Sequence, residues 1–128
     1  MDMRNPLSRV RGLGAAKEGV SHWWAQRVTA VALVPLTLWF VTSLVMLAGA
    51  NYVTMVEWVS QPWVSVLLIL FIVATFHHAQ LGLQVVIEDY VSAEGMKIAS
   101  LLLVKFAAIL FAAAAVLAVL QITLGGRP

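Results

Sequence analysis

The 128-residue sequence has no cysteine and few charged residues. The lack of cysteine excludes disulfides, cysteine nucleophiles and thiolate-ligated iron–sulfur clusters within this chain. No G-x-G-x-x-G or P-loop pattern occurs, so nothing indicates that the chain itself binds a flavin or a nucleoside phosphate. Only 11% of the residues are charged and 62% are hydrophobic. A soluble domain of this size could not keep so much apolar surface away from water. The composition therefore predicts an integral membrane protein with a single domain.

Three long apolar stretches predict three membrane-spanning helices and an all-α fold. A hydrocarbon core of ~30 Å needs about 20 apolar residues of helix. The expected spans cover roughly residues 27–50, 62–89 and 96–124. Small residues in an alanine-rich run at 107–118 offer a surface for close helix packing.

Proline, serine and glycine mark the expected helix boundaries. Pro35 lies inside the first span, where it removes a backbone hydrogen bond and is expected to bend the helix. Ser60 is expected to cap the second span, with Pro62 in its first turn. Gly125, followed by a second glycine, is expected to end the third span.

The basic residues predict the orientation. Four of them precede the first span, none occurs in the loop 51–61, and Lys97 lies at the turn between the second and third spans. The positive-inside rule then places the N-terminus and the 88–97 turn in the cytoplasm, and the C-terminus in the periplasm. Residues 1–21 are interpreted as a cytoplasmic tail, not a cleaved signal peptide, because charges interrupt any apolar core. The four basic residues are Arg4, Arg9, Arg11 and Lys17.

A histidine inside the second span is the main candidate functional residue. The run 58–87 contains His78 but no Lys, Arg, Asp or Glu, and a ligating side chain in a membrane span is costly without a partner. The usual partner of a buried neutral imidazole is a metal or a haem iron, although a structural hydrogen bond remains the alternative. Gly82, one turn away, would let a flat macrocycle approach the backbone. Four residues fall within about 40° of one line on this helix: His78, Gly82, Val85 and Asp89.

A second polar stripe runs along the same span. His77 points about 100° away from His78, and no other histidine lies inside an expected span. A six-coordinate haem on His78 would therefore take its other ligand from a partner subunit. Hydrogen bonding between helices is one interpretation of the stripe, and a proton or water path toward the inner surface is the other. Lys105, about 12 Å into the third span, is expected to snorkel toward the cytoplasmic side. The stripe comprises His77, Gln80, Gln84 and Glu88.

Two segments carry a resemblance to a known family. The stretch HAQLGLQVVIEDY, from His78 to Tyr90, resembles the H-A-x-x-G-x(6)-D-Y signature of the smaller cytochrome b-type anchor of succinate dehydrogenase, the D subunit of complex II. The segment HWWAQRVTA, from His22 to Ala30, is similar to the H…R-x-T-A segment at that family's first span. The chain length, the three spans and the expected topology agree with that family. The sequence HHAQLGLQVVIEDY is similar to that of alphaproteobacterial or mitochondrial-type members.

The resemblance implies roles for individual residues. His78 would be an axial ligand of haem b, shared with a histidine of a C-type cytochrome b anchor subunit. Tyr90 would hydrogen-bond a ubiquinone carbonyl oxygen, and Asp89 would support that site. Arg27 would lie near the haem propionates or the quinone pocket, with His22 close to the same region.

The same resemblance implies a function in the bacterial inner membrane. The chain would anchor a flavoprotein and an iron–sulfur subunit, and pass electrons from succinate oxidation to ubiquinone without being catalytic alone. The nearest alternative is the anchor of a menaquinol:fumarate reductase, since the same scaffold could serve the reverse reaction. Alternatives of another class are a small transporter subunit, with the His77 stripe as its polar path, and a structural membrane adaptor.

Overall fold

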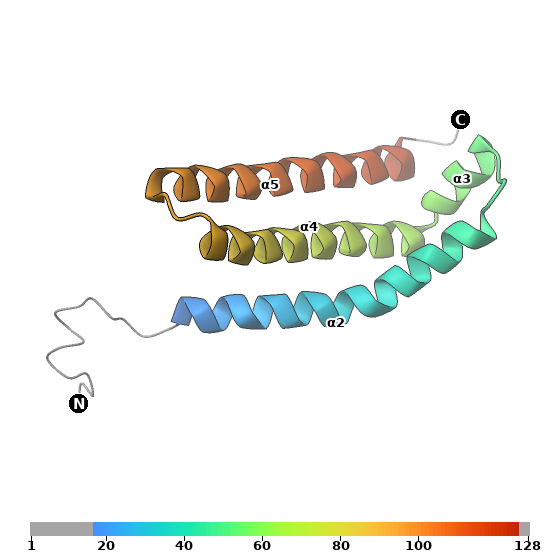
Figure 1. Cartoon of the computed structure of the whole chain (residues 1–128). Helices are drawn as coiled ribbons and strands as arrows, with labels where there is room; N and C mark the ends of the chain where they lie inside the picture. Colours follow the sequence, from blue (N-terminus) through green and yellow to red (C-terminus); the bar gives the residue numbers. More distant parts are fainter. Residues whose placement is uncertain (1–16, 126–128) are drawn as a thin grey trace, which may run out of the picture.

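The computed structural model describes residues 17–125, which form helices and no strand (Figure 1). The expected all-α fold is confirmed. Residues 1–16 of the predicted tail, together with Gly126 and Arg127, lie outside the described residues. The helices are α2 (Lys17–Met46), α3 (Tyr52–Val59), α4 (Pro62–Tyr90) and α5 (Glu94–Leu124).

Helices α2, α4 and α5 are each long and apolar enough to cross a membrane, which confirms the three expected spans. Helix α4 starts at Pro62, as predicted, and ends one residue beyond the expected boundary. Helix α2 starts at residue 17 instead of 27 and ends at residue 46 instead of 50. It ends early because the chain turns at Gly49, whose φ of +83° lies in the left-handed region that favours glycine.

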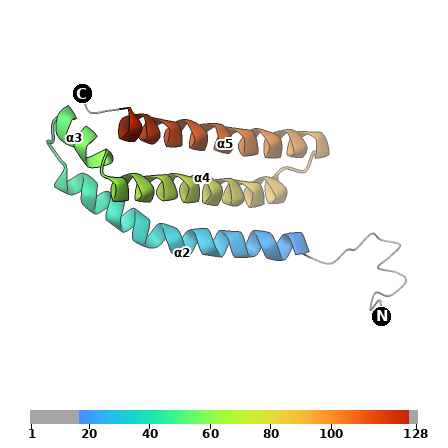
Figure 2. The same ribbon diagram turned by 180° about the vertical axis from the view of Figure 1, so that it is seen from behind.

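Helix α4 lies in the middle of the molecule, with α2 and α5 on opposite sides of it (Figures 1 and 2). The backbones of α2 and α5 do not contact each other within residues 17–125. The start of α2 and the α4–α5 turn lie at one end, and α3 and the end of α5 lie at the other (Figure 1). Helix α2 contains Pro35 and curves over its second half, as expected (Figure 1). The three long helices therefore lie side by side in one layer, which leaves the two faces of α4 between its neighbours partly open.

The structure adds a short helix, α3, where only a loop was expected. Asn51 caps it, because its side-chain Oδ1 accepts a hydrogen bond from the backbone N–H of Thr54 at 2.9 Å. The prediction that Ser60 caps the second span was wrong: Gln61 is the N-cap of α4, without a side-chain bond. Ser60 instead follows the last residue of α3, and its hydroxyl donates to the Val56 carbonyl at 2.7 Å. Because the Ser60 hydroxyl is bonded to the Val56 carbonyl of α3, it does not cap the start of α4.

The small core of the chain lies at the α3 end. Val64 is fully buried there and packs with Leu68 of α4 and Val119 of α5. Trp39 of α2 and Trp58 of α3 stack beside this core, with ring centroids 5.9 Å apart. This end holds the three long helices and α3 together, whereas the half of α4 from His78 to Tyr90 has few buried side chains.

Candidate functional site

Helices α2 and α4 meet at a contact between Thr29 and His78. The Thr29 Oγ1 lies 3.0 Å from the His78 Nδ1. Within the described residues this is the side-chain hydrogen bond that joins α2 to α4. Thr29 faces α4 because it shares one side of α2 with His22 and Gln26, seven and three residues earlier. No role for Thr29 was predicted from the sequence, although it is the threonine of the R-x-T-A segment and its spacing from His22 and Gln26 on an apolar helix is a signal that could have indicated one.

The contacts of Thr29 indicate which nitrogen of His78 carries the proton. The Thr29 hydroxyl has one proton, and its shortest contact is to the Ala25 carbonyl oxygen, at 2.7 Å. The Gln26 carbonyl oxygen lies further away, at 3.1 Å. A hydroxyl that donates to a backbone carbonyl has only lone pairs left for the imidazole, so His78 Nδ1–H is the donor. The unprotonated nitrogen is then Nε2, which has no hydrogen-bond partner among residues 17–125 and retains a lone pair for a metal.

Gly82 lies one turn from His78, on the side of α4 that faces α2. A Cβ at this position would meet only the Nε2 of Gln26, at the ordinary contact distance of 3.8 Å. Packing within the described chain therefore does not require a glycine here. The missing side chain leaves room for a group that this chain does not itself supply.

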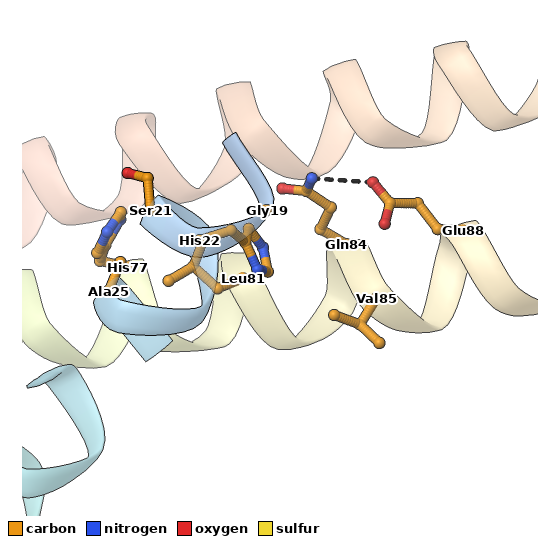
Figure 3. A pocket seen from close by; sticks show the side chains of 9 residues that line it. All are labelled: Gly19, Ser21, His22, Ala25, His77, Leu81, Gln84, Val85 and Glu88. Atoms are coloured by element: carbon orange, nitrogen blue, oxygen red, sulfur yellow. Dashed lines mark hydrogen bonds between the residues drawn. The ribbon is translucent and has the colours of Figure 1, made fainter. Parts of the chain in front are cut away.

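An open pocket lies between α2 and α4, beside His22 and His77 (Figure 3). Its volume is about 710 Å³. The Nε2 of His22 and the Oε1 of Gln26 are buried nearby without a hydrogen-bond partner in the described part of the chain. Such atoms are costly unless something pairs with them, so they indicate that a partner chain, a ligand or water completes this region. The pocket is lined by Gly19, Ser21, His22, Ala25, His77, Leu81, Gln84, Val85 and Glu88.

The polar stripe that starts at His77 does not join helices within residues 17–125. The Gln84 Nε2 donates to the Glu88 Oε1 at 2.9 Å, a bond within α4 (Figure 3). Lys105 is exposed on α5 and lines a separate recess with Gln80 and Gln84. The hydrogen bonds expected between helices are therefore not made by the described residues of this chain.

Arg27 lies on a different side of α2 from Thr29, because two residues of helix turn the side chain by about 200°. Its guanidinium carbon lies 5.3 Å from the ring centroid of Trp23, a cation–π contact. Trp23 and Trp24 are exposed and meet edge to face at 5.1 Å. The structure therefore places His22 beside the pocket but does not bring Arg27 to His78, and the exposed Arg27–Trp23 pair is available to a partner.

Asp89 and Tyr90 are the last residues of α4 and are exposed. Tyr90 is 84% exposed, and its hydroxyl has no hydrogen-bond partner among the described residues. Twelve residues of helix separate it from His78, which corresponds to about 18 Å along the axis. The phenol and the carboxylate thus stand at the end of the span, where a ligand from the lipid can reach them.

These features define a class of protein: a small polytopic membrane protein with exposed polar groups and, among the described residues, an imidazole nitrogen that has no partner. The chain belongs to the succinate dehydrogenase/fumarate reductase transmembrane subunit family, whose model matches residues 1–119. This result confirms the resemblance found in the sequence, and the chain is a multi-pass membrane protein.

The chain is similar to several curated proteins. It is 35% identical over 120 residues to the succinate dehydrogenase hydrophobic membrane anchor subunit of Rickettsia bellii, covering 92% of this chain and 94% of that protein. The corresponding subunit of Paracoccus denitrificans is 32% identical over 109 residues, covering 85% and 84% of the two chains. The succinate dehydrogenase membrane anchor subunit of Reclinomonas americana is 31% identical over 96 residues, covering 73% and 80%. No solved structure matches the chain significantly.

Proposed function

We propose that this chain is the hydrophobic membrane anchor subunit of a succinate:ubiquinone oxidoreductase, and that His78 is an axial ligand of haem b. The observation that carries the haem assignment is the Thr29–His78 contact of 3.0 Å at Nδ1. With Nδ1–H donating to Thr29, the nitrogen free to ligate the iron inside the span would be Nε2. The family match and the curated relatives support the oxidoreductase over a transporter or a structural adaptor.

The residues of the chain fit a haem better than a metal ion held by several side chains. No group of three histidine, cysteine or acidic residues that could hold a metal lies within the described residues. His78 would hold the haem iron from this chain, and a histidine of the C-type anchor subunit would hold it from the partner side. When bound, the haem supplies a one-electron carrier near the quinone. Gly82 leaves room beside its ligand, and the buried Nε2 of His22 is a candidate partner for a propionate.

The end of α4 suits a quinone. Tyr90 O–H donates to a carbonyl oxygen of ubiquinone, and Asp89 beside it supports the phenol and takes part in proton uptake at the water boundary. Their exposure supports this role, because a quinone from the lipid must reach the phenol directly. Arg27 is exposed beside Trp23. Its guanidinium pairs with a carboxylate of a partner chain or with a haem propionate.

The partner chains supply the remaining redox groups. This chain has no cysteine, so the iron–sulfur clusters belong to a separate iron–sulfur subunit, which docks with a flavoprotein subunit on the cytoplasmic face. Electrons from succinate pass through those subunits to ubiquinone beside Tyr90. The chain itself binds and orients the haem and the quinone, and Tyr90 and Asp89 help deliver the two protons that the two-electron reduction of ubiquinone needs; the chain forms no covalent intermediate.

The test is a reduced-minus-oxidised absorption spectrum of the complex purified from its native membrane, for the wild type, His78→Ala and His77→Ala. We expect a b-type haem signal in the wild type and in His77→Ala, because His77 lines the pocket on another side of α4. We expect it to be lost in His78→Ala. A haem signal retained in His78→Ala, or an equal loss in both variants, would overturn the ligand assignment.

A further inference from the structure

We infer that Thr29 is a positioning residue, which sets the tautomer and ring orientation of His78 through a hydrogen-bond relay from the Ala25 carbonyl oxygen. The relay runs from His78 Nδ1–H to Thr29 Oγ1 at 3.0 Å, and from the Thr29 hydroxyl to the Ala25 carbonyl at 2.7 Å. This inference rests on the proposed role of His78 as a haem ligand. It adds a residue of another helix, 49 positions away in the chain, to that site.

Threonine suits this position because its rotamer is restricted twice. A β-branched side chain in a helix has few χ1 rotamers, and threonine selects between them by bonding a carbonyl three or four residues earlier. Thr29 makes contacts of this kind with Ala25 and Gln26. The lone pairs of Oγ1 are therefore held in place before His78 meets them, and the imidazole ring is oriented by α2, not by α4 alone.

The bond has a chemical consequence at the far side of the ring. A ligating histidine that donates its other N–H to an acceptor is held in the correct tautomer and becomes a more basic ligand. The reverse arrangement, in which Thr29 donates to Nδ1, would place the proton on Nε2 and remove the lone pair that iron needs. The backbone carbonyl of Ala25, which accepts the hydrogen bond from the Thr29 hydroxyl, is thus what keeps Nε2 of His78 available.

The experiment uses the complex purified from its native membrane, with Thr29→Val, Thr29→Ser and a matched control. Valine keeps the shape of threonine and removes the hydroxyl, while serine restores the hydroxyl without the methyl group. The control is Thr37→Val, an exposed threonine eight residues further along α2. Haem b per flavoprotein subunit and the haem reduction potential are measured, and succinate oxidation with a soluble acceptor reports assembly.

We expect Thr29→Val to weaken haem retention by about tenfold, as loss of a partner behind a metal ligand commonly does. Its reduction potential should become more positive, because a less basic imidazole stabilises ferric iron less. Thr29→Ser should return both values to within about twofold of the wild type, and Thr37→Val should leave both unchanged. A role in packing alone would not produce rescue by the smaller serine.

Three results would overturn the inference. They are a Thr29→Val complex with unchanged haem content and potential, an assembled Thr29→Ser complex that is no better than Thr29→Val, and a Thr29→Val complex that fails to assemble while Thr29→Ser assembles. The third would show that the hydroxyl serves folding. If His78→Ala loses haem while Thr29→Val is normal, only this inference fails; if His78→Ala keeps haem, the proposed ligand itself is wrong.

Discussion

Ser65 and Thr123 meet across the interface of α4 and α5, with their hydroxyl oxygens 2.9 Å apart. The Ser65 Oγ also lies 2.6 Å from the carbonyl oxygen of Val59, the last residue of α3. Ser65 is buried, with only 5% of its surface exposed. One hydroxyl therefore links three helices at the end of the molecule opposite to the proposed quinone site.

Replacing Ser65 by alanine should destabilise the chain without changing its redox groups. Hydrogen bonds between membrane helices contribute about 0.6 kcal/mol on average, and a buried polar group left unpaired costs more, so we expect a loss of about 1 kcal/mol. Thermal denaturation of the purified complex measures this loss. Ser92→Ala, in the exposed turn between α4 and α5, is the control, and an equal loss in both variants would contradict the prediction.

Substituting Gly82 tests whether the space beside His78 belongs to a group outside this chain. Gly82→Ala should preserve the helices, because the new Cβ meets only Gln26 at 3.8 Å and alanine favours a helix by about 1 kcal/mol over glycine. We expect haem content to fall in Gly82→Ala and further in Gly82→Val. Haem absorbance and circular dichroism measure the two effects separately.

The control for that series is Gly95→Ala, at the start of α5, where nothing lies within 4 Å of the added Cβ. Its haem content should match the wild type. A full haem content in Gly82→Val would show that the space beside His78 is not used by the haem.

Removing the Tyr90 hydroxyl should affect ubiquinone reduction alone. One hydrogen bond contributes about 0.5–1.5 kcal/mol, so Tyr90→Phe should lower kcat/KM for ubiquinone roughly 2- to 10-fold. Succinate oxidation with a soluble artificial acceptor should persist, because that activity bypasses the quinone. Tyr52→Phe, exposed on α3 at the opposite end, is the control. A parallel fall of both activities in Tyr90→Phe would indicate defective assembly instead.

The spans were predictable from sequence because a bilayer imposes a length of about 20 apolar residues. The start of α2 was not, since residues 17–26 include charged and polar side chains that can form helix without matching a hydropathy pattern. Helix α3 was missed although Asn51 carries a capping signal at its start. Hydropathy reports what lipid tolerates, and helix boundaries also depend on local capping.

His78 could be singled out from the sequence because an imidazole is rare in a membrane span. Its contact with Thr29 could not, because the two residues are 49 positions apart and meet only when α2 packs on α4. His78 and Gly82 lie on one side of α4, as their spacing predicted, but the sequence did not show that this side faces Gln26 and Thr29 of α2. Contacts within one helix follow from its periodicity, whereas contacts between helices depend on how the helices dock.

The scarcity of buried side chains in this layer has a consequence for the life of the protein in the cell. Val64 is fully buried, yet most large apolar side chains of the described chain are exposed. A subunit that completes so little of its own interior gains stability by mass action from whatever binds it. Its survival against membrane proteases should therefore follow the supply of its partners, so that orphan copies are removed and subunit ratios are set by turnover as well as by synthesis.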